Sequence, residues 1–306
     1  MTSSTFPNDP LWPRAGLWLA KDAEASAREV DVALIGVPAF RSSISPTGAH
    51  ATPAAIREAL LRYSTHAGSR GIDLAGVTAL DLGDIPDPDG PEGEERVCVA
   101  VAAASGAHRL LIALGGDNSV TYSVMRGIAG DCLADWGLIT VDAHHDLRDG
   151  ISNGSPVRRL IEAGLPGTNV VQVGIADFAN SAAYAKRAAE HGITIVHRAE
   201  LRGRSMAEVA AEALAVAGHG GRPVYVDLDM DVCDRAVVPG CPAAAPGGIA
   251  ADELRELAYA FGRDARVRAV DITEADALAD APDGRTVRLA ALLVLEVAAG
   301  LAARAR

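Results

Sequence analysis

One short acidic segment combines residue types and a spacing that could hold a metal ion. Asp142, His144 and Asp146 stand at alternate positions directly after an apolar run. Alternate side chains of an extended chain point to the same side, so these three can converge while Ala143 and His145 point away. Carboxylates and an imidazole are typical ligands of a divalent cation. The segment therefore predicts a metal site at the end of a strand.

A second acidic segment repeats this pattern further along the chain. Asp227 and Asp229 alternate at the end of another apolar run, and Asp231 and Asp234 follow them. The same extended geometry brings Asp227 and Asp229 together. Two interpretations of Asp231 and Asp234 stay open, because such residues either bind the ion or support the ligands and the turn around them.

Four of these carboxylates require positive charge if they lie together. Asp142, Asp146, Asp227 and Asp229 would repel one another and raise one another's pKa unless cations neutralise them. Their four negative charges match two divalent ions. Mostly oxygen ligands with one imidazole favour Mn²⁺ first and Mg²⁺ second, because Zn²⁺ usually takes more His or Cys.

Alternating strand and helix patterns supply the frame that would position these side chains. Apolar runs of strand length alternate with Ala-rich stretches of helical period from residue 30 nearly to the C-terminus. This alternation predicts right-handed crossovers and a mainly parallel sheet with helices on both faces. Strands are predicted at residues 32–37, 77–80, 109–114, 137–141, 170–174, 193–197, 224–228 and 267–272. Helices are predicted at residues 53–62, 94–104, 119–127, 156–163, 181–191, 206–216, 252–261 and 285–303.

The predicted architecture is a single α/β domain over residues 1–306, with residues 1–29 as an N-terminal extension. No internal repeat or linker divides the chain, and α/β domains built on one large sheet reach this length. The fold class is therefore a three-layer α/β/α arrangement around an eight-stranded, mainly parallel sheet. Residues 84–93 and 238–248 are rich in Pro, Gly and Asp and predict loops.

Composition excludes several classes of function. A net charge of −12 disfavours a nucleic-acid partner, because binding to phosphates needs a basic surface. The longest apolar run, residues 289–303, contains Glu296 and is shorter than the about 20 residues that cross a bilayer, so no membrane partner is expected. No secretory signal opens the chain, which predicts a cytoplasmic protein. The four cysteines lack C-x-x-C spacing and are expected as buried thiols.

A third segment, Gly115-Gly-Asp-Asn-Ser119, completes a resemblance to the ureohydrolase (arginase/agmatinase) family. The signature segments of that family are G-G-D-H-S, D-A-H-x-D and a D-x-D near S-x-D-x-D-x-x-D-P. The resemblance implies an arginase-like fold and a centre of two Mn²⁺ ions per subunit. It implies that Asp142 and Asp227 bridge the ions, that Asp146 completes one site, and that His144 and Asp229 complete the other.

The chain departs from the family pattern at three positions. Asn118 replaces the first-ligand His, and since an amide oxygen is a weaker ligand than imidazole, one ion is expected to bind weakly. Arg235 replaces the Pro of the final D-P pair, after Asp234, and Ala277 replaces another expected Pro.

Other segments look most like the formimidoylglutamase branch of the family. They are residues 36–45, 142–148, 152–158 and 239–243. Asn153 stands where arginases and agmatinases usually have a His before Gly. Glu274, in the segment Asp271-Ile-Thr-Glu, matches the family residue that contacts the amidino group.

The resemblance implies hydrolysis of N-formimidoyl-L-glutamate to L-glutamate and formamide, a step of histidine degradation. A metal-bound hydroxide would attack the amidino carbon, Asp146 would carry its proton, and Glu274 would hold the amidinium. Asn153 and Arg148 are the expected substrate contacts, with Arg158 and Arg159 as further candidates for the substrate carboxylates.

Two other functions stay open. One is that of an agmatinase or another hydrolase of guanidino compounds, and the other is that of a catalytically silent family member weakened at the first metal site by Asn118. By analogy with the family, a homo-oligomer, either a trimer or a hexamer, is expected.

Overall fold

A single sheet of eight strands organises the chain. The computed structural model describes residues 9–19 and 30–304. Every strand pair in this sheet is parallel. In sheet order the strands are β4 (Ala79–Asp84), β1 (Val30–Val37), β5 (His108–Gly115), β10 (Val267–Thr273), β9 (Val224–Asp229), β6 (Gly137–Val141), β7 (Val170–Ile175) and β8 (Thr194–His197). A separate antiparallel pair consists of β2 (His66–Ala67) and β3 (Ile72–Asp73).

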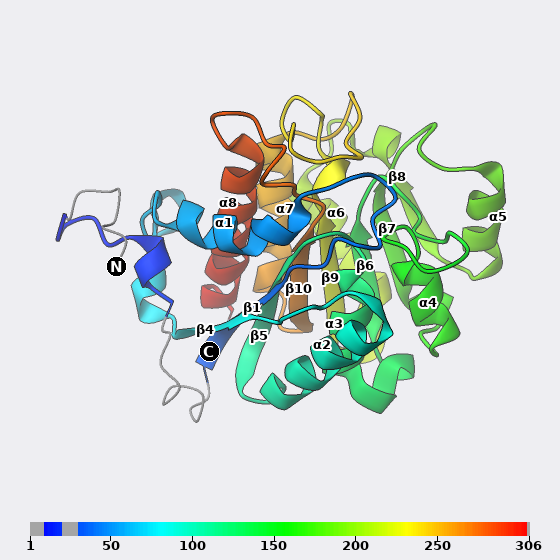
Figure 1. The fold of residues 1–306 in the computed structure, drawn as a ribbon, viewed down its shortest axis with the longest axis horizontal. Helices are drawn as coiled ribbons and strands as arrows, with labels where there is room; N and C mark the ends of the chain where they lie inside the picture. Colours follow the sequence, from blue (N-terminus) through cyan, green and yellow to red (C-terminus); the bar gives the residue numbers. More distant parts are fainter. Residues whose placement is uncertain (1–8, 20–29, 305–306) are drawn as a thin grey trace.

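Helices cover both faces of this sheet (Figure 1). Alternate residues of one strand enter different cores: Leu110 and Ile112 of β5 join one hydrophobic cluster, whereas Leu111 joins the other. Strands buried on both faces are apolar along their whole length for this reason. The first cluster includes α1 (Thr52–Leu60), α6 (Met206–Ala217), α7 (Ala251–Arg263) and α8 (Arg285–Ala302). The second includes α2 (Gly90–Ala104), α3 (Val120–Ala129), α4 (Pro156–Glu162) and α5 (Ala182–Glu190).

The predicted α/β/α class with eight strands is confirmed, and the differences are local. The strand predicted at 77–80 instead begins at Ala79, because Asp73 caps a 3-10 turn over Leu74–Gly76. The loop predicted at 84–93 is shorter, since α2 already begins at Gly90. Cys233 and Cys241 are buried as expected, whereas Cys132 is exposed in a surface turn after α3, so the prediction was wrong for that thiol.

The carboxyl ends of the central strands bring the predicted segments to one edge of the sheet. Chain segments following β5, β10, β9 and β6 meet there. In the sheet, β10 and β9 separate β5 from β6, although β5 and β6 are consecutive strands in the sequence. Such a reversal of strand order opens a crevice at the carboxyl ends. Among the described helices, none is long and apolar enough to cross a membrane.

Candidate metal centre

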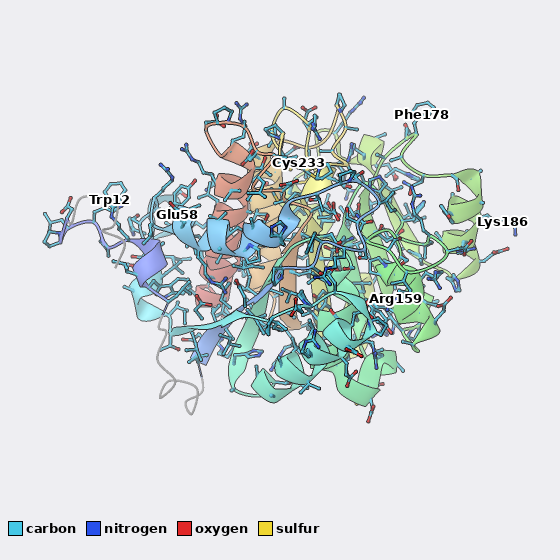
Figure 2. The ribbon with its side chains drawn as sticks, in the orientation of Figure 1. Trp12, Glu58, Arg159, Phe178, Lys186 and Cys233 are labelled. Atoms are coloured by element: carbon cyan, nitrogen blue, oxygen red, sulfur yellow. The ribbon has the colours of Figure 1, made fainter. Side chains whose placement is uncertain are left out.

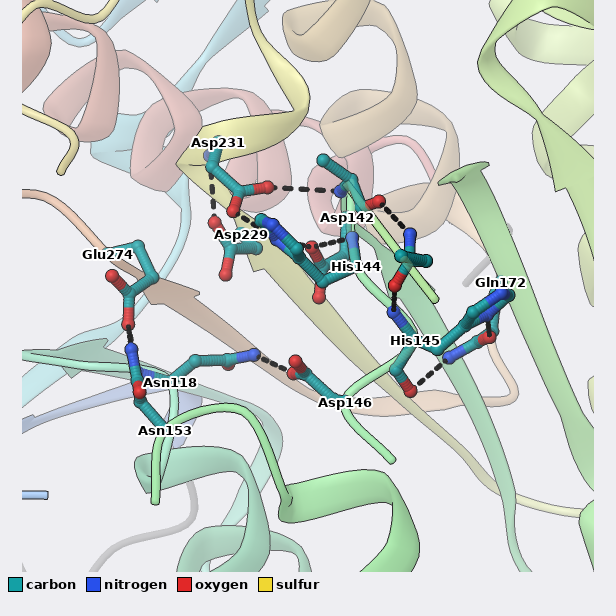
Figure 3. A network of polar contacts seen from close by, with 12 residues as sticks. Asn118, Asp142, His144, His145, Asp146, Asn153, Gln172, Asp229, Asp231 and Glu274 are labelled. Carbon is teal, nitrogen blue, oxygen red and sulfur yellow. Dashed lines mark hydrogen bonds and ion pairs between the residues drawn. The ribbon is translucent and has the colours of Figure 1, made fainter. Parts of the chain in front are cut away.

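Asp142, His144 and Asp231 form the tightest group of potential metal ligands. One ligand atom from each lies within 4.8 Å of the others. His144 Nδ1 is 2.7 Å from an oxygen of Asp231 and 3.4 Å from an oxygen of Asp142 (Figure 3). Both carboxylates are buried. The structure thus joins the two acidic segments and brings Asp231, for which the sequence left two interpretations, into direct contact with His144.

A tight turn after β9 directs Asp231 toward the first acidic segment. The Asp229 carboxylate accepts a hydrogen bond from the Asp231 amide at 2.8 Å, which caps the 3-10 turn Met230–Val232. The other oxygen of Asp231 accepts from the amide of Ala143 at 3.0 Å. The extended, alternating geometry predicted for the second segment therefore ends at Asp229, and the turn supplies the remaining carboxylate.

Asp227 lies deeper than Asp229 and Asp231 of the same segment. It is fully buried, pairs in register with Asp271 of β10, and accepts from the Thr273 hydroxyl at 3.3 Å. Asp229 and Asp231 line the cavity described below, whereas Asp227 does not. Asp271 itself accepts from the hydroxyls of Thr121 and Tyr225, at 2.8 and 2.7 Å. The expected bridging role of Asp227 stays a prediction, and its surroundings are those of a residue beneath the site.

Asn118 points its side-chain nitrogen toward the carboxylate of Asp146 and its side-chain oxygen toward two threonine hydroxyls. Its side-chain nitrogen donates to Asp146, and its oxygen accepts from Thr121 at 2.9 Å and from Thr273 at 3.1 Å. The expected role of Asn118 as a weak metal ligand stays a prediction; in this structure its side-chain nitrogen orients Asp146. Asp146 adopts a left-handed backbone with φ of 53°.

The site concentrates buried negative charge. Burial, with a contribution from the charge of Asp231, raises the pKa of Asp142 to about 7. Burial likewise raises the pKa values of Asp146, Asp227 and Asp229 well above the usual range. Three carboxylate oxygens here, on Asp142, Asp227 and Asp271, have no hydrogen-bond partner among the described residues.

One positive side chain partly offsets this charge. Although burial opposes it, the carboxylates of Asp231 and Asp142 raise the pKa of His144 to about 12. Burial acts against ionisation of Asp231 too, but the contact with His144 lowers the pKa of Asp231 overall. A single imidazolium cannot balance the buried carboxylates, so the donor set fits divalent cations.

A cavity of about 330 Å³ opens beside these ligands. Glu274 lines it, and one of its oxygens accepts from the Asn118 backbone amide at 2.8 Å and from the Asn153 side chain at 2.9 Å. The Asn153 oxygen is held by the amide of Ile44 at 3.0 Å. Burial and the nearby charge of Asp117 raise the pKa of Glu274 to about 8. Glu274, like Asp146, has a left-handed backbone, with φ of 61°.

Only one of the three candidate arginines reaches this cavity. Arg148 lines it and is exposed, with no side-chain partner among the described residues. Arg158 pairs with Glu162. Arg159, which Figure 2 labels, pairs with Glu94 of α2, stacks on the ring of Tyr122 and does not line the cavity. His145 points away from the ligands, as expected, with its ring 2.7 Å from Gln172.

Comparison with known proteins identifies the family. Residues 30–300 match the family model for the Arginase family. The chain belongs to the arginase family. It is 36% identical to a formimidoylglutamase of Halalkalibacterium halodurans over 276 residues, which cover 87% of this chain and 86% of that protein. It is 30% identical to a guanidinopropionase of Pseudomonas aeruginosa, with 88% and 86% covered.

Solved structures of the family have the same fold. A crystal structure of formimidoylglutamase from Bacillus subtilis superposes with a TM-score of 0.92 at 31% identity, covering 100% of this chain and 97% of that one. A structure of Trypanosoma cruzi formiminoglutamase with Mn²⁺ superposes with a TM-score of 0.88 at 23% identity, covering 96% and 100%. The predicted family, its formimidoylglutamase branch and the arginase-like fold are confirmed.

The spacing of the family segment assigns Asp231 to a ligand position, although the alternation of residues along the strand favoured Asp227 and Asp229. In the family segment S-x-D-x-D-x-x-D-P, the final Asp before the Pro position corresponds to Asp234, which precedes Arg235. Counting back from Asp234 places the two earlier aspartates at Asp231 and Asp229, and the Ser position at Asp227. This spacing agrees with the cavity lining, in which Asp229 and Asp231 take part.

Proposed function

We propose that this protein hydrolyses N-formimidoyl-L-glutamate to L-glutamate and formamide with the help of two divalent metal ions, Mn²⁺ first. The observation that carries the proposal is the convergence of His144, Asp231, Glu274 and Arg148 on one cavity, with the buried Asp142 in the same ligand group as His144 and Asp231. The relatives named as formimidoylglutamases support the choice of substrate. The reaction would contribute to histidine degradation. The cytoplasmic location and the trimer or hexamer stay predictions.

The residues around the cavity suit divalent cations. Asp142, His144 and Asp231 would hold one ion, and Asp229 and Asp146 would serve the second. This proposal replaces Asp227 by Asp231, because Asp231 contacts His144 and belongs to the group of ligand atoms with Asp142, whereas Asp227 does not. Oxygen ligands with one imidazole favour Mn²⁺, and the Trypanosoma cruzi structure that contains Mn²⁺ supports this choice. Bound divalent ions would lower the pKa of coordinated water, so that hydroxide is available near neutral pH.

Protein side chains would hold the substrate and move its protons. Asp146, which is oriented by the Asn118 amide, would pass a proton from the attacking water to the leaving nitrogen. Glu274 would bind the amidinium through charge-assisted hydrogen bonds, and its position is fixed by Asn118 and Asn153. Arg148 would bind a carboxylate of the glutamate moiety, since it lines the cavity without another side-chain partner among the described residues.

The main rival is a hydrolase of a guanidino acid. The Pseudomonas aeruginosa guanidinopropionase is 30% identical. A guanidino acid would also present a cation to Glu274 and a carboxylate to Arg148. The products separate these functions, because guanidino compounds release urea and formimidoylglutamate releases formamide.

Product analysis with metal-loaded protein tests the proposal. The protein, stripped with a chelator and reloaded with Mn²⁺, should release formamide from formimidoylglutamate and no urea from agmatine, arginine or guanidinopropionate. Urea from any of these without formamide would favour the rival. No turnover of any substrate by protein that demonstrably binds Mn²⁺ would identify a catalytically silent family member.

A further inference from the structure

A second, larger cavity lies along α2 and shares no residue with the candidate metal centre. It encloses about 990 Å³ and runs between α2 and the strands β4 and β1. The helix α2 packs mainly against α3 and turns Val97 and Val101 inward. β4 is the edge strand of the sheet (Figure 1), and its residues line this cavity together with those of α2, so the cavity forms a groove along the sheet edge.

The lining of this groove is mainly apolar and is recessed by small residues. Leu82 of β4 and Val99 of α2 are large apolar side chains exposed at its rim. Ala33 of β1 and Ala100 and Ala103 of α2 leave room between the strands and the helix. Ligand sites for small molecules are typically concave and apolar, with few polar groups that fix orientation.

One end of the groove carries a buried histidine without a partner. His108, the first residue of β5, is 6% exposed, and neither ring nitrogen has a hydrogen-bond partner among the described residues. Burial, with the charge of Arg268, lowers the pKa of His108 to about 4, so the ring is neutral and offers one donor and one acceptor. Buried polar groups without hydrogen-bond partners are rare and destabilise the fold. A bound molecule that forms a hydrogen bond with the His108 ring would remove this cost.

Arg96 of α2 also lines the groove. Its guanidinium donates to the carbonyl of Pro86 at 3.3 Å and to that of Asp87, which ties α2 to the loop after β4. An occupant therefore meets a mainly apolar lining that also carries the charged residues Asp84, Glu92, Glu95 and Arg96, and His108 is its neutral polar group without a partner among the described residues. Rotation of the His108 ring about its soft χ2 torsion would present a nitrogen to that occupant.

We propose that this groove binds an elongated, mainly apolar small molecule whose terminal hydroxyl or amide group hydrogen-bonds to His108. The recessed position of His108 favours a small molecule over a second copy of the chain, since only an occupant that enters the groove can reach the ring. The rim residues Leu82 and Val99 would cover its apolar body.

The test compares 2-naphthol with 2-methylnaphthalene, two probes of one ring system with and without a hydroxyl group. Both are titrated against the full-length, Mn²⁺-loaded protein by naphthalene fluorescence. The wild type should bind 2-naphthol about fivefold more tightly, as one hydrogen bond predicts. His108→Phe should bind both probes equally. Ala100→Trp, which fills the groove, should bind neither, whereas Ala102→Trp, outside the lining on the exposed side of α2, should bind like the wild type.

Melting temperature and hydrolytic activity confirm that each variant is folded. The proposal is overturned if neither probe binds the wild type, if Ala100→Trp binds both probes, or if the preference for 2-naphthol survives in His108→Phe. It is also overturned if light scattering shows that Ala100→Trp dissociates an oligomer, because the groove would then be a contact between copies.

Discussion

Replacement of Asp231 by Asn tests which carboxylates hold the metal. Asp231 contacts His144 Nδ1 at 2.7 Å, and both belong to the group of ligand atoms within 4.8 Å of one another. Two opposite unit charges about 4 Å apart near a protein surface attract by about 4 kcal/mol. A cation bound by this group would lie within that distance of the Asp231 carboxylate. Removal of the charge should therefore weaken Mn²⁺ binding by about 10³-fold, with activity lost in parallel.

Asp227→Asn is the matched control for this prediction. It removes an equally buried carboxylate from the same segment, but one that does not line the cavity. Residues behind metal ligands typically change affinity by about 10- to 100-fold, so Mn²⁺ should still bind. Calorimetric titration of chelator-stripped protein measures both affinities, and circular dichroism checks the fold. The reasoning is refuted if folded Asp227→Asn loses Mn²⁺ as completely as Asp231→Asn, or if Asp231→Asn binds like the wild type.

Three further predictions concern the same site. Asn118→His should tighten Mn²⁺ binding because imidazole is the better ligand, and an unchanged affinity in the same titration would mean that residue 118 does not face the ion. Arg148→Met should raise KM for formimidoylglutamate about 10- to 100-fold with little change in kcat, whereas Arg158→Met should change neither; equal effects in steady-state kinetics would contradict the role of Arg148. Burial raises the folded-state pKa of Asp142 to about 7 and of Glu274 to about 8, so the stability that their protons contribute is present below about pH 4 and lost as pH rises through these values. Metal-free protein should therefore melt at a lower temperature at pH 8 than at pH 5, and addition of Mn²⁺ should recover the stability that is lost at pH 8. A metal-free protein that is more stable at pH 8 than at pH 5 would contradict this.

Local sequence pattern predicted most of the fold, because strands buried on both faces leave a clear signal. The apolar runs of β6 and β9 end directly in acidic residues, so both their extent and the edge of the sheet that they share could be predicted. The pattern failed where a side chain redirects the backbone. The Asp229 carboxylate caps the turn Met230–Val232, and that bend, which no periodicity encodes, moves Asp231 next to His144.

The sequence favoured Arg148 as a substrate contact but could not show why it, rather than Arg158 or Arg159, lines the cavity. Arg148, Arg158 and Arg159 lie within a dozen residues of one another, and what separates them is their tertiary surroundings. Glu94, which holds Arg159, belongs to a helix 65 residues away in the chain. The orientation of Asn118 has the same origin, since its oxygen is held by Thr273 from a distant strand.

The left-handed backbones of Asp146 and Glu274 set a limit on engineering this enzyme for heat resistance. A residue with a side chain in this conformation destabilises the fold by roughly 1–2 kcal/mol relative to glycine, so selection for thermal tolerance alone would favour glycine at both positions. Each such gain would delete a carboxylate from the cavity of the proposed site. Robust variants should therefore be sought elsewhere in the chain, with these two positions held fixed in any library.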